Sequence, residues 1–162
     1  MSDIHDLLER YRRGPELIAT VMTGAAGAEL DFKSAPDKWT VREIVAHLAD
    51  SEIVAADRFR RIVAEENPTL IGYDQNAWTA NLNYARRKSS ESVDLFRRLR
   101  ADSYELLKDL PPEAFERRGN HSERGAITLR QFVQTMAEHA EAHAHQIRRA
   151  RESYKQARQA HA

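Results

Sequence analysis

The stretch TLRQFVQTMAEHAEAHAHQIRRARESYKQA, residues 128–157, decides the fold. Thr128 and Gln131 form a capping box, in which each side chain can bond the backbone N–H of the other, so a helix is predicted to begin at Leu129. Apolar side chains then recur every three or four residues, which is typical of a helix with one buried side. They are Leu129, Phe132, Val133, Met136, Ala140, Ile147 and Tyr154. A final helix is therefore predicted to reach about residue 157.

Three earlier regions show the same helical periodicity. They cover residues 3 to about 24, 41 to about 66, and about 90 to 110. In the first, Pro15 can open a new helical turn or kink a continuous helix. The second follows another capping box, made by Thr40 and Glu43. Four amphipathic helices joined by loops predict an all-α four-helix bundle that occupies residues 1–162 as a single domain.

The connecting segments are predicted to be mostly irregular. Residues 25–39 and 117–126 are expected to be loops, and Asp74 is expected to cap a short helix within the less regular stretch 69–88. No segment alternates apolar and polar residues over a convincing length, so no β-sheet is expected.

Composition excludes several classes of protein. The 162 residues carry 25 Lys or Arg and 25 Asp or Glu. This balance disfavours a nucleic-acid partner, because binding phosphates requires a basic excess on some face. No run of about 18 apolar residues exists to span a membrane, and the acidic opening residues lack the apolar core of a secretory signal. The absence of cysteine rules out thiolate ligands and a cysteine nucleophile, and is consistent with a cytoplasmic protein.

Histidines on the last helix offer the first sign of chemistry. His139 and His143 are four residues apart and fall within or beside the apolar side of the helix, whereas His145 falls on the solvent side. Two imidazoles at this spacing form half of a zinc or nickel site. The alternative is a pair of core histidines that bond Glu, Gln or backbone groups. A zincin motif is excluded because Ala140 replaces the required Glu, and the Glu-x-x-His pairs of ferritin-type sites are absent.

A third ligand is predicted on the second long helix. His47 lies in the apolar stretch 46–49, at the edge of the buried side. His121, in the polar loop before the last helix, is a competing candidate as a fourth ligand or a residue at the mouth of the site, or a solvated loop residue. His5 and His161 are assigned no role.

Other polar residues could support the site. Asp50, Glu52 and Gln146 lie close enough in sequence or on the helix surface to orient an imidazole, although Asp50 and Glu52 could equally be solvated. Arg117, Arg118 and Arg124 flank His121 and could bind an anionic substrate, or could simply be solvated.

Two of these segments resemble a known family. Residues 38–52, KWTVREIVAHLADSE, resemble the W-[ST]-x-x-E-x-x-x-H segment of the DinB-like, YfiT-type superfamily. Residues 139–147, HAEAHAHQI, resemble its C-terminal H-x-x-x-H-x-x-Q-I segment. The stretches 72–78 and 121–129 are also similar, so the resemblance covers roughly residues 15–155.

The resemblance implies an up-down-down-up four-helix bundle, often dimeric, with a divalent metal held by His47, His139 and His143. Zinc or nickel is expected, with a small-molecule substrate and a homodimer. Characterised members include transferases and isomerases that use bacillithiol, mycothiol or glutathione-type thiols. The expected function is therefore metal-dependent transfer of a small-molecule thiol to an electrophile. A metal-dependent hydrolase, a non-catalytic metal-binding or stress-related bundle, and a bundle that binds no metal remain as alternatives.

Overall fold

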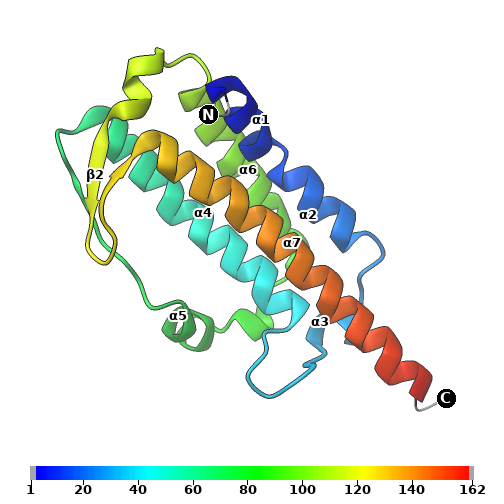
Figure 1. The fold of residues 1–162 in the computed structure, drawn as a ribbon. Coiled ribbons are helices and arrows are strands. Elements are labelled where there is room, and N and C mark those ends of the chain that lie inside the picture. The colour runs from blue at the N-terminus through cyan, green and yellow to red at the C-terminus, as the bar shows by residue number, and fades with distance from the viewer. Residues whose placement is uncertain (1–2, 161–162) are drawn as a thin grey trace.

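The structure is a computed structural model that describes residues 3–160. Its long helices are α1 (Ile4–Arg12), α2 (Gly14–Met22), α4 (Val41–Ala64), α6 (Ser89–Leu107) and α7 (Leu129–Ala160). Figure 1 shows α1 and α2 following one another along one side of the bundle, while α4 and α7 run side by side in opposite directions. Together, α1 and α2 form the first arm of the bundle. This arm runs in the same direction as α7, whereas α4 and α6 run in the opposite direction, so the predicted up-down-down-up bundle is confirmed.

Local signals explain where the helices begin. Thr40 and Glu43 exchange their predicted capping bonds, at 3.1 Å for the Glu43 N–H and 2.8 Å for the Thr40 N–H. Thr128 and Gln131 do the same at 3.1 and 2.9 Å. The Asp74 carboxylate caps α5 (Gln75–Asn81) by accepting two backbone N–H groups. Each box satisfies N–H groups that a helix start otherwise leaves unpaired.

The first arm is interrupted because of a packing constraint. Gly14 begins α2, and a Cβ atom at this position would lie 2.1 Å from Nη1 of Arg100. The glycine therefore leaves space for a buried guanidinium that arrives from α6. Pro15 stands in the first turn of α2, where its missing N–H costs no hydrogen bond.

The expectation that no sheet forms was wrong. β1 (Thr69–Leu70), β2 (Arg118–His121) and β3 (Gly125–Thr128) form a small sheet, with β1 parallel to β2 and β2 antiparallel to β3. Most of the expected loop 117–126 is thus a β-hairpin. The strands are too short and too polar to show an alternation of apolar and polar residues. Only Leu70 and Gly119 are buried in them. A Cβ on Gly119 would lie 2.8 Å from the Leu70 side chain, so the hairpin packs directly on the core.

Short helical elements fill the other connections. They are α3 (Ala28–Asp31), η1 (Tyr84–Arg86) and η2 (Pro112–Glu116), of which α3 lies in the expected loop 25–39. Two apolar clusters form the core, one around Tyr11, Phe59 and Phe132 and the other around Leu48, Phe96 and Ile147. Among the described residues, no helix is long and apolar enough to cross a bilayer.

Candidate metal centre

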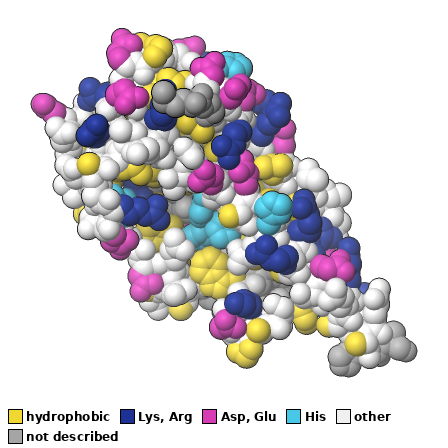
Figure 2. Space-filling view, viewed as in Figure 1, with side chains coloured by type: hydrophobic (Ala, Val, Ile, Leu, Met, Phe, Trp, Pro, Cys, Tyr) yellow, Lys and Arg dark blue, Asp and Glu magenta, His cyan; other side chains and the backbone are white. Residues whose placement is uncertain are grey.

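Three histidines from two antiparallel helices meet between α4 and α7. The Nε2 atoms of His47 and His139 lie 3.0 Å apart, and those of His139 and His143 lie 3.1 Å apart. One nitrogen of each ring falls within 4.8 Å of the other two. His47 is 1% exposed, and His139 and His143 are partly buried. Figure 2 shows histidine side chains gathered on this face of the bundle, with Lys or Arg side chains nearby.

Helix geometry positions each ring. His139 and His143 share one side of α7 because they are four residues apart. His47 faces them because its neighbours Ala46 and Leu48 are core residues, which bury this turn of α4. The Trp39 ring packs against the His47 ring, with centroids 5.0 Å apart. Helix geometry therefore brings the three rings together, and Trp39, from the segment before α4, packs against one of them.

Burial keeps the three imidazoles neutral. It is the main cause that lowers the pKa of His47 to about 4 and that of His139 to about 2, with the neighbouring His143 adding to both shifts. Burial also lowers the pKa of His143, while its contact with Gln146 acts in the opposite sense. Neutral imidazoles at pH 7 have free lone pairs, which is the form that binds a metal.

The donor set fits a divalent metal. A neutral imidazole has one N–H and one acceptor nitrogen, yet Nε2 of His139 faces two other nitrogens and its Nδ1 is buried without a hydrogen-bond partner among the described residues. A cation at the point where the three nitrogens converge would accept all three lone pairs. Three histidines with an open fourth position form a familiar catalytic site for zinc, and imidazole also suits nickel.

Gln146 is one predicted supporting residue that contacts the cluster. Its Oε1 lies 2.7 Å from Nδ1 of His143. A hydrogen on Nδ1 satisfies this contact and leaves the lone pair of Nε2 directed at the other two rings. Such a partner fixes both the tautomer and the orientation of a metal-binding histidine.

Asp50 and Glu52 have other partners. Asp50 accepts bonds from the Tyr84 hydroxyl and the Arg87 guanidinium, at 2.8 and 2.6 Å. Glu52 is fully buried against Tyr11 and Arg100. Within residues 3–160 neither carboxylate hydrogen-bonds His47, although the charge of Asp50 opposes the lowering of its pKa.

The other residues considered from the sequence do not join the histidine cluster. His121 ends β2 outside the cluster, where its Nδ1 accepts the Glu123 N–H at 3.2 Å. Arg117 donates to the Ile62 and Glu65 carbonyls and so fastens the hairpin to the end of α4. His145, like His5 and Arg118, is exposed, whereas His161 lies outside the described residues.

Two polar residues that contact the core of the bundle, Arg58 and Tyr73, were not singled out from the sequence. A signal for Arg58 existed, because it follows His47 by eleven residues, about three turns, and so occupies the same side of α4. Tyr73 lies in the stretch 72–78 that resembles the family, but residues 71–74 have no regular structure, so no periodicity predicts where its side chain lies.

The fold and site together define a helical bundle whose facing helices direct three histidines to one point. The family model of the DinB superfamily matches residues 10–147. The chain therefore belongs to the DinB superfamily, as the resemblance of its two histidine segments implied.

Individual relatives agree with this assignment. A protein of Oceanobacillus iheyensis, named "putative metal-dependent hydrolase", is 31% identical over 140 residues, which cover 86% of this chain and 81% of the relative. YfiT from Bacillus subtilis carries the same description and is 31% identical over 72% of this chain and 66% of its own. The solved YfiT structure, described as an unusual four-helix bundle, superposes with a TM-score of 0.78 over 90% of this chain and 85% of its own, at 27% identity.

A more distant structure shares the fold. The mycothiol-dependent maleylpyruvate isomerase superposes with a TM-score of 0.69 at 16% identity, over 89% of this chain and 62% of that protein.

Proposed function

We propose that this protein is a divalent-metal-dependent enzyme that transfers a small-molecule thiol to an electrophile. The observation that carries the proposal is the convergence of three neutral imidazole nitrogens, from His47, His139 and His143, at one partly buried point. When bound, a divalent metal with an open position lowers the pKa of a coordinated thiol or water and so provides a nucleophile near neutral pH.

The residues of the chain prepare this site. The apolar surroundings keep the three imidazoles unprotonated. Gln146 holds the His143 ring in the tautomer that exposes Nε2, and Trp39 packs against the His47 ring. Because the chain has no cysteine, the thiol must come from a small molecule. The mycothiol-dependent isomerase with this fold is consistent with that choice.

Hydrolysis is the second candidate. It is favoured by two relatives at 31% identity, each of which is named "putative metal-dependent hydrolase". The same histidines would serve, with water in place of the thiol. The two reactions therefore differ in their substrates and not in the histidines that would bind the metal.

The first test is metal content. Protein without a histidine tag is expected to bind about one zinc or nickel ion per chain, and His139→Ala/His143→Ala is expected to bind none, as measured by elemental analysis. His145→Ala is the matched control, because that ring is exposed on the same helix. Equal metal content in the double variant and the wild type would reject the site.

The second test is the reaction. The metal-loaded protein is incubated with a chromogenic electrophile and each of glutathione, bacillithiol and mycothiol, and separately with ester and amide substrates. Conjugation that requires both metal and thiol supports transfer. Hydrolysis without thiol supports the second candidate, and a metal-loaded protein that does neither rejects both.

A further inference from the structure

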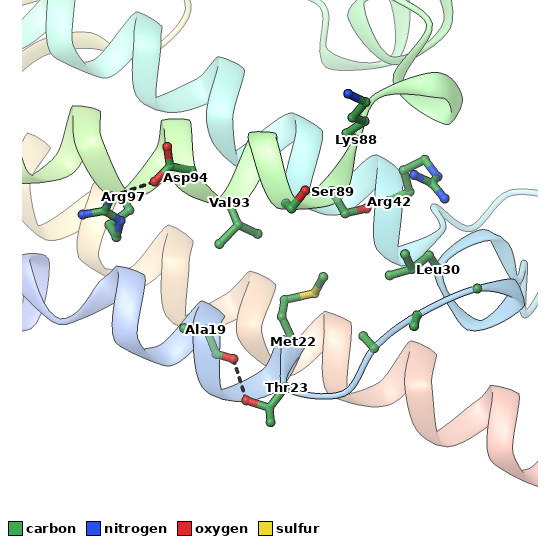
Figure 3. Close-up of a pocket in the computed structure, with 14 residues that line it drawn as sticks. Ala19, Met22, Thr23, Leu30, Arg42, Lys88, Ser89, Val93, Asp94 and Arg97 are labelled. Carbon is green, nitrogen blue, oxygen red and sulfur yellow. Dashed lines mark hydrogen bonds and ion pairs between the residues drawn. The ribbon is translucent and has the colours of Figure 1, made fainter.

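A cavity of about 630 Å³ lies between α2 and α6 (Figure 3). Its wall comes from α2, the turn that follows it, α3, and the beginnings of α4 and α6. Within residues 3–160, the three histidines of the metal centre do not line it. Cavities that bind small molecules typically measure roughly 300–1,000 Å³. This one is therefore large enough for a small organic ligand that does not contact the histidines.

Most of the wall is apolar. Ile18 and Val21 bury one side of α2 in the core, whereas Ala19 and Met22 line the cavity. The side chain of Ala19 is too small to fill the space between the two helices. Figure 3 shows Met22 from α2 and Val93 from α6 extending into this space. Such a surface suits the apolar body of a ligand.

One end of the cavity is the N-terminus of α6, a helix of 19 residues. Lys88 stands at the N-cap position, and its side chain accepts no backbone N–H group. The Ser92 N–H bonds the Lys88 carbonyl at 3.1 Å, so the N–H groups before it have no acceptor within their own helix. Lys88, Ser89 and Ser90 all line the cavity. Free N–H groups and the helix dipole favour an anion at such an end.

A buried hydroxyl at the same end independently indicates a ligand. Ser89 is 7% exposed, and its Oγ is buried without a hydrogen-bond partner in the described part of the chain. Buried polar groups in folded proteins nearly always have partners, and a serine hydroxyl can donate one hydrogen bond. The wall of the cavity therefore holds a donor that lacks an acceptor, beside N–H groups that lack acceptors too.

The cations around the cavity limit the charge of the ligand. Each of the three that line it is paired with a carboxylate. The pairs are Arg42 with Asp31, Lys88 with Glu91, and Arg97 with Asp94. The groups left for a ligand are thus the helix N-terminus and the Ser89 hydroxyl. They suit a single negative charge, because a doubly charged group would need a further cation.

We propose that the cavity between α2 and α6 binds a small organic acid that has one carboxylate and an apolar body. The carboxylate accepts hydrogen bonds from the first turn of α6 and from Ser89. The apolar body packs against Met22, Leu30 and Val93. This site is separate from the metal centre and does not rest on the proposed function.

Octanoate is the probe, and isothermal titration calorimetry measures its binding to metal-free and zinc-loaded protein. We expect a Kd of about 1 mM or lower in both forms. Octanamide has the same chain without the charge, and acetate has the charge without the chain. Each should bind at least about tenfold more weakly, because each lacks one of the two interactions. The backbone amide NMR signals of Ser89, Ser90 and Glu91 should shift when octanoate is added.

Two pairs of variants locate the site. Ser89→Ala should weaken octanoate binding about tenfold, because a hydrogen bond to a charged group is lost. Ser92→Ala is the matched control, since it removes a buried, unpartnered hydroxyl from the same turn that does not line the cavity. Ala19→Phe should abolish binding by filling the cavity from an exposed position. Thr20→Phe, at the next exposed position and outside the cavity, should change it less than about twofold.

Several results would overturn the inference. They are no octanoate binding, equal affinity in Ser89→Ala and Ser92→Ala, and equal affinity in Ala19→Phe and Thr20→Phe. Binding that requires zinc would also overturn it, because it would place the carboxylate at the histidines. Octanamide bound as tightly as octanoate would reject the carboxylate, and inorganic phosphate bound more tightly would reject the single charge. Octanoate binding to protein that never binds zinc would support this site while the proposed function fails.

Discussion

Two buried polar clusters share α4 and α7 but are satisfied in opposite ways. The guanidinium of Arg100 is fully buried, and its donors reach the Glu52 carboxylate and the backbone carbonyls of Tyr11 and Met136. The Tyr11 hydroxyl completes the network by donating to Glu52 at 2.5 Å. In the histidine cluster, by contrast, Nε2 of His139 lies within 3.1 Å of two other ring nitrogens, and its Nδ1 has no partner among the described residues.

The difference separates a structural network from a binding site. Around Arg100 the fold supplies acceptors to the buried guanidinium, so the cluster needs nothing from outside. Met136 is three residues before His139, so the Arg100 network also holds α7 one turn from the metal centre. The histidine cluster is less deeply buried, because His139 and His143 are partly exposed, and within residues 3–160 it has no electrophile for its nitrogen lone pairs. A group of ring nitrogens without partners is what a bound cation would satisfy.

The largest expected effect comes from breaking the satisfied network. Arg100→Met should lower the free energy of unfolding by about 3–5 kcal/mol, because Glu52 would be left as a buried charge without a partner. Urea denaturation followed by circular dichroism measures it. Arg97→Met is the control, since it removes an exposed cation from the same helix and should cost less than about 1 kcal/mol. Equal losses in the two variants would show that the network is not structural.

The second prediction concerns the effect of zinc on the histidine cluster. Zinc at a free concentration 100 times its Kd should raise the free energy of unfolding by about 2.7 kcal/mol, since the folded state alone brings the three histidines together. His143→Ala should lose this gain in urea titrations with and without zinc, and His145→Ala should keep it. A zinc effect of similar size in both variants would place the metal elsewhere.

The third prediction concerns the metal-free protein at low pH. The folded-state pKa values of His47, about 4, and His139, about 2, lie below the ordinary value of 6.5. The unfolded chain therefore binds protons first, so this stability is fully present above pH 6.5 and is lost as the pH falls toward 4. For one such histidine the loss between pH 6.5 and 5 is roughly 2 kcal/mol.

Denaturation at several pH values tests this sign. His139→Ala should depend less on pH than the wild type, while His145→Ala should follow the wild type. A stability that rises on acidification across this range would contradict the buried neutral state of the cluster.

The smallest expected effect concerns the one histidine that has a partner. Gln146→Leu should weaken zinc binding about tenfold, because His143 loses the acceptor that fixes its tautomer. Competition with a chromophoric chelator measures the affinity. Gln134→Leu is the control, because Gln134 is exposed on the same helix and bonds only Glu138 among the described residues. An unchanged affinity in Gln146→Leu would mean that ring packing alone orients His143.

The sequence by itself determined the helices and the position of two histidines on one side of α7. Capping at Thr40 and Thr128, apolar periodicity and the four-residue spacing of His139 and His143 depend on residues within one or two turns of each other. A linear pattern carries such information directly.

Only the tertiary structure decided which side chains meet across elements. The packing of α4 against α7 places His47 beside His139 and Arg58 beside the Phe132 ring, and the packing of α4 against α6 buries Glu52 against Arg100 instead of an imidazole. It also turns the polar stretch around Gly119 into a hairpin seated on Leu70. These contacts depend on the relative register of helices and strands far apart in the chain, which no local periodicity encodes.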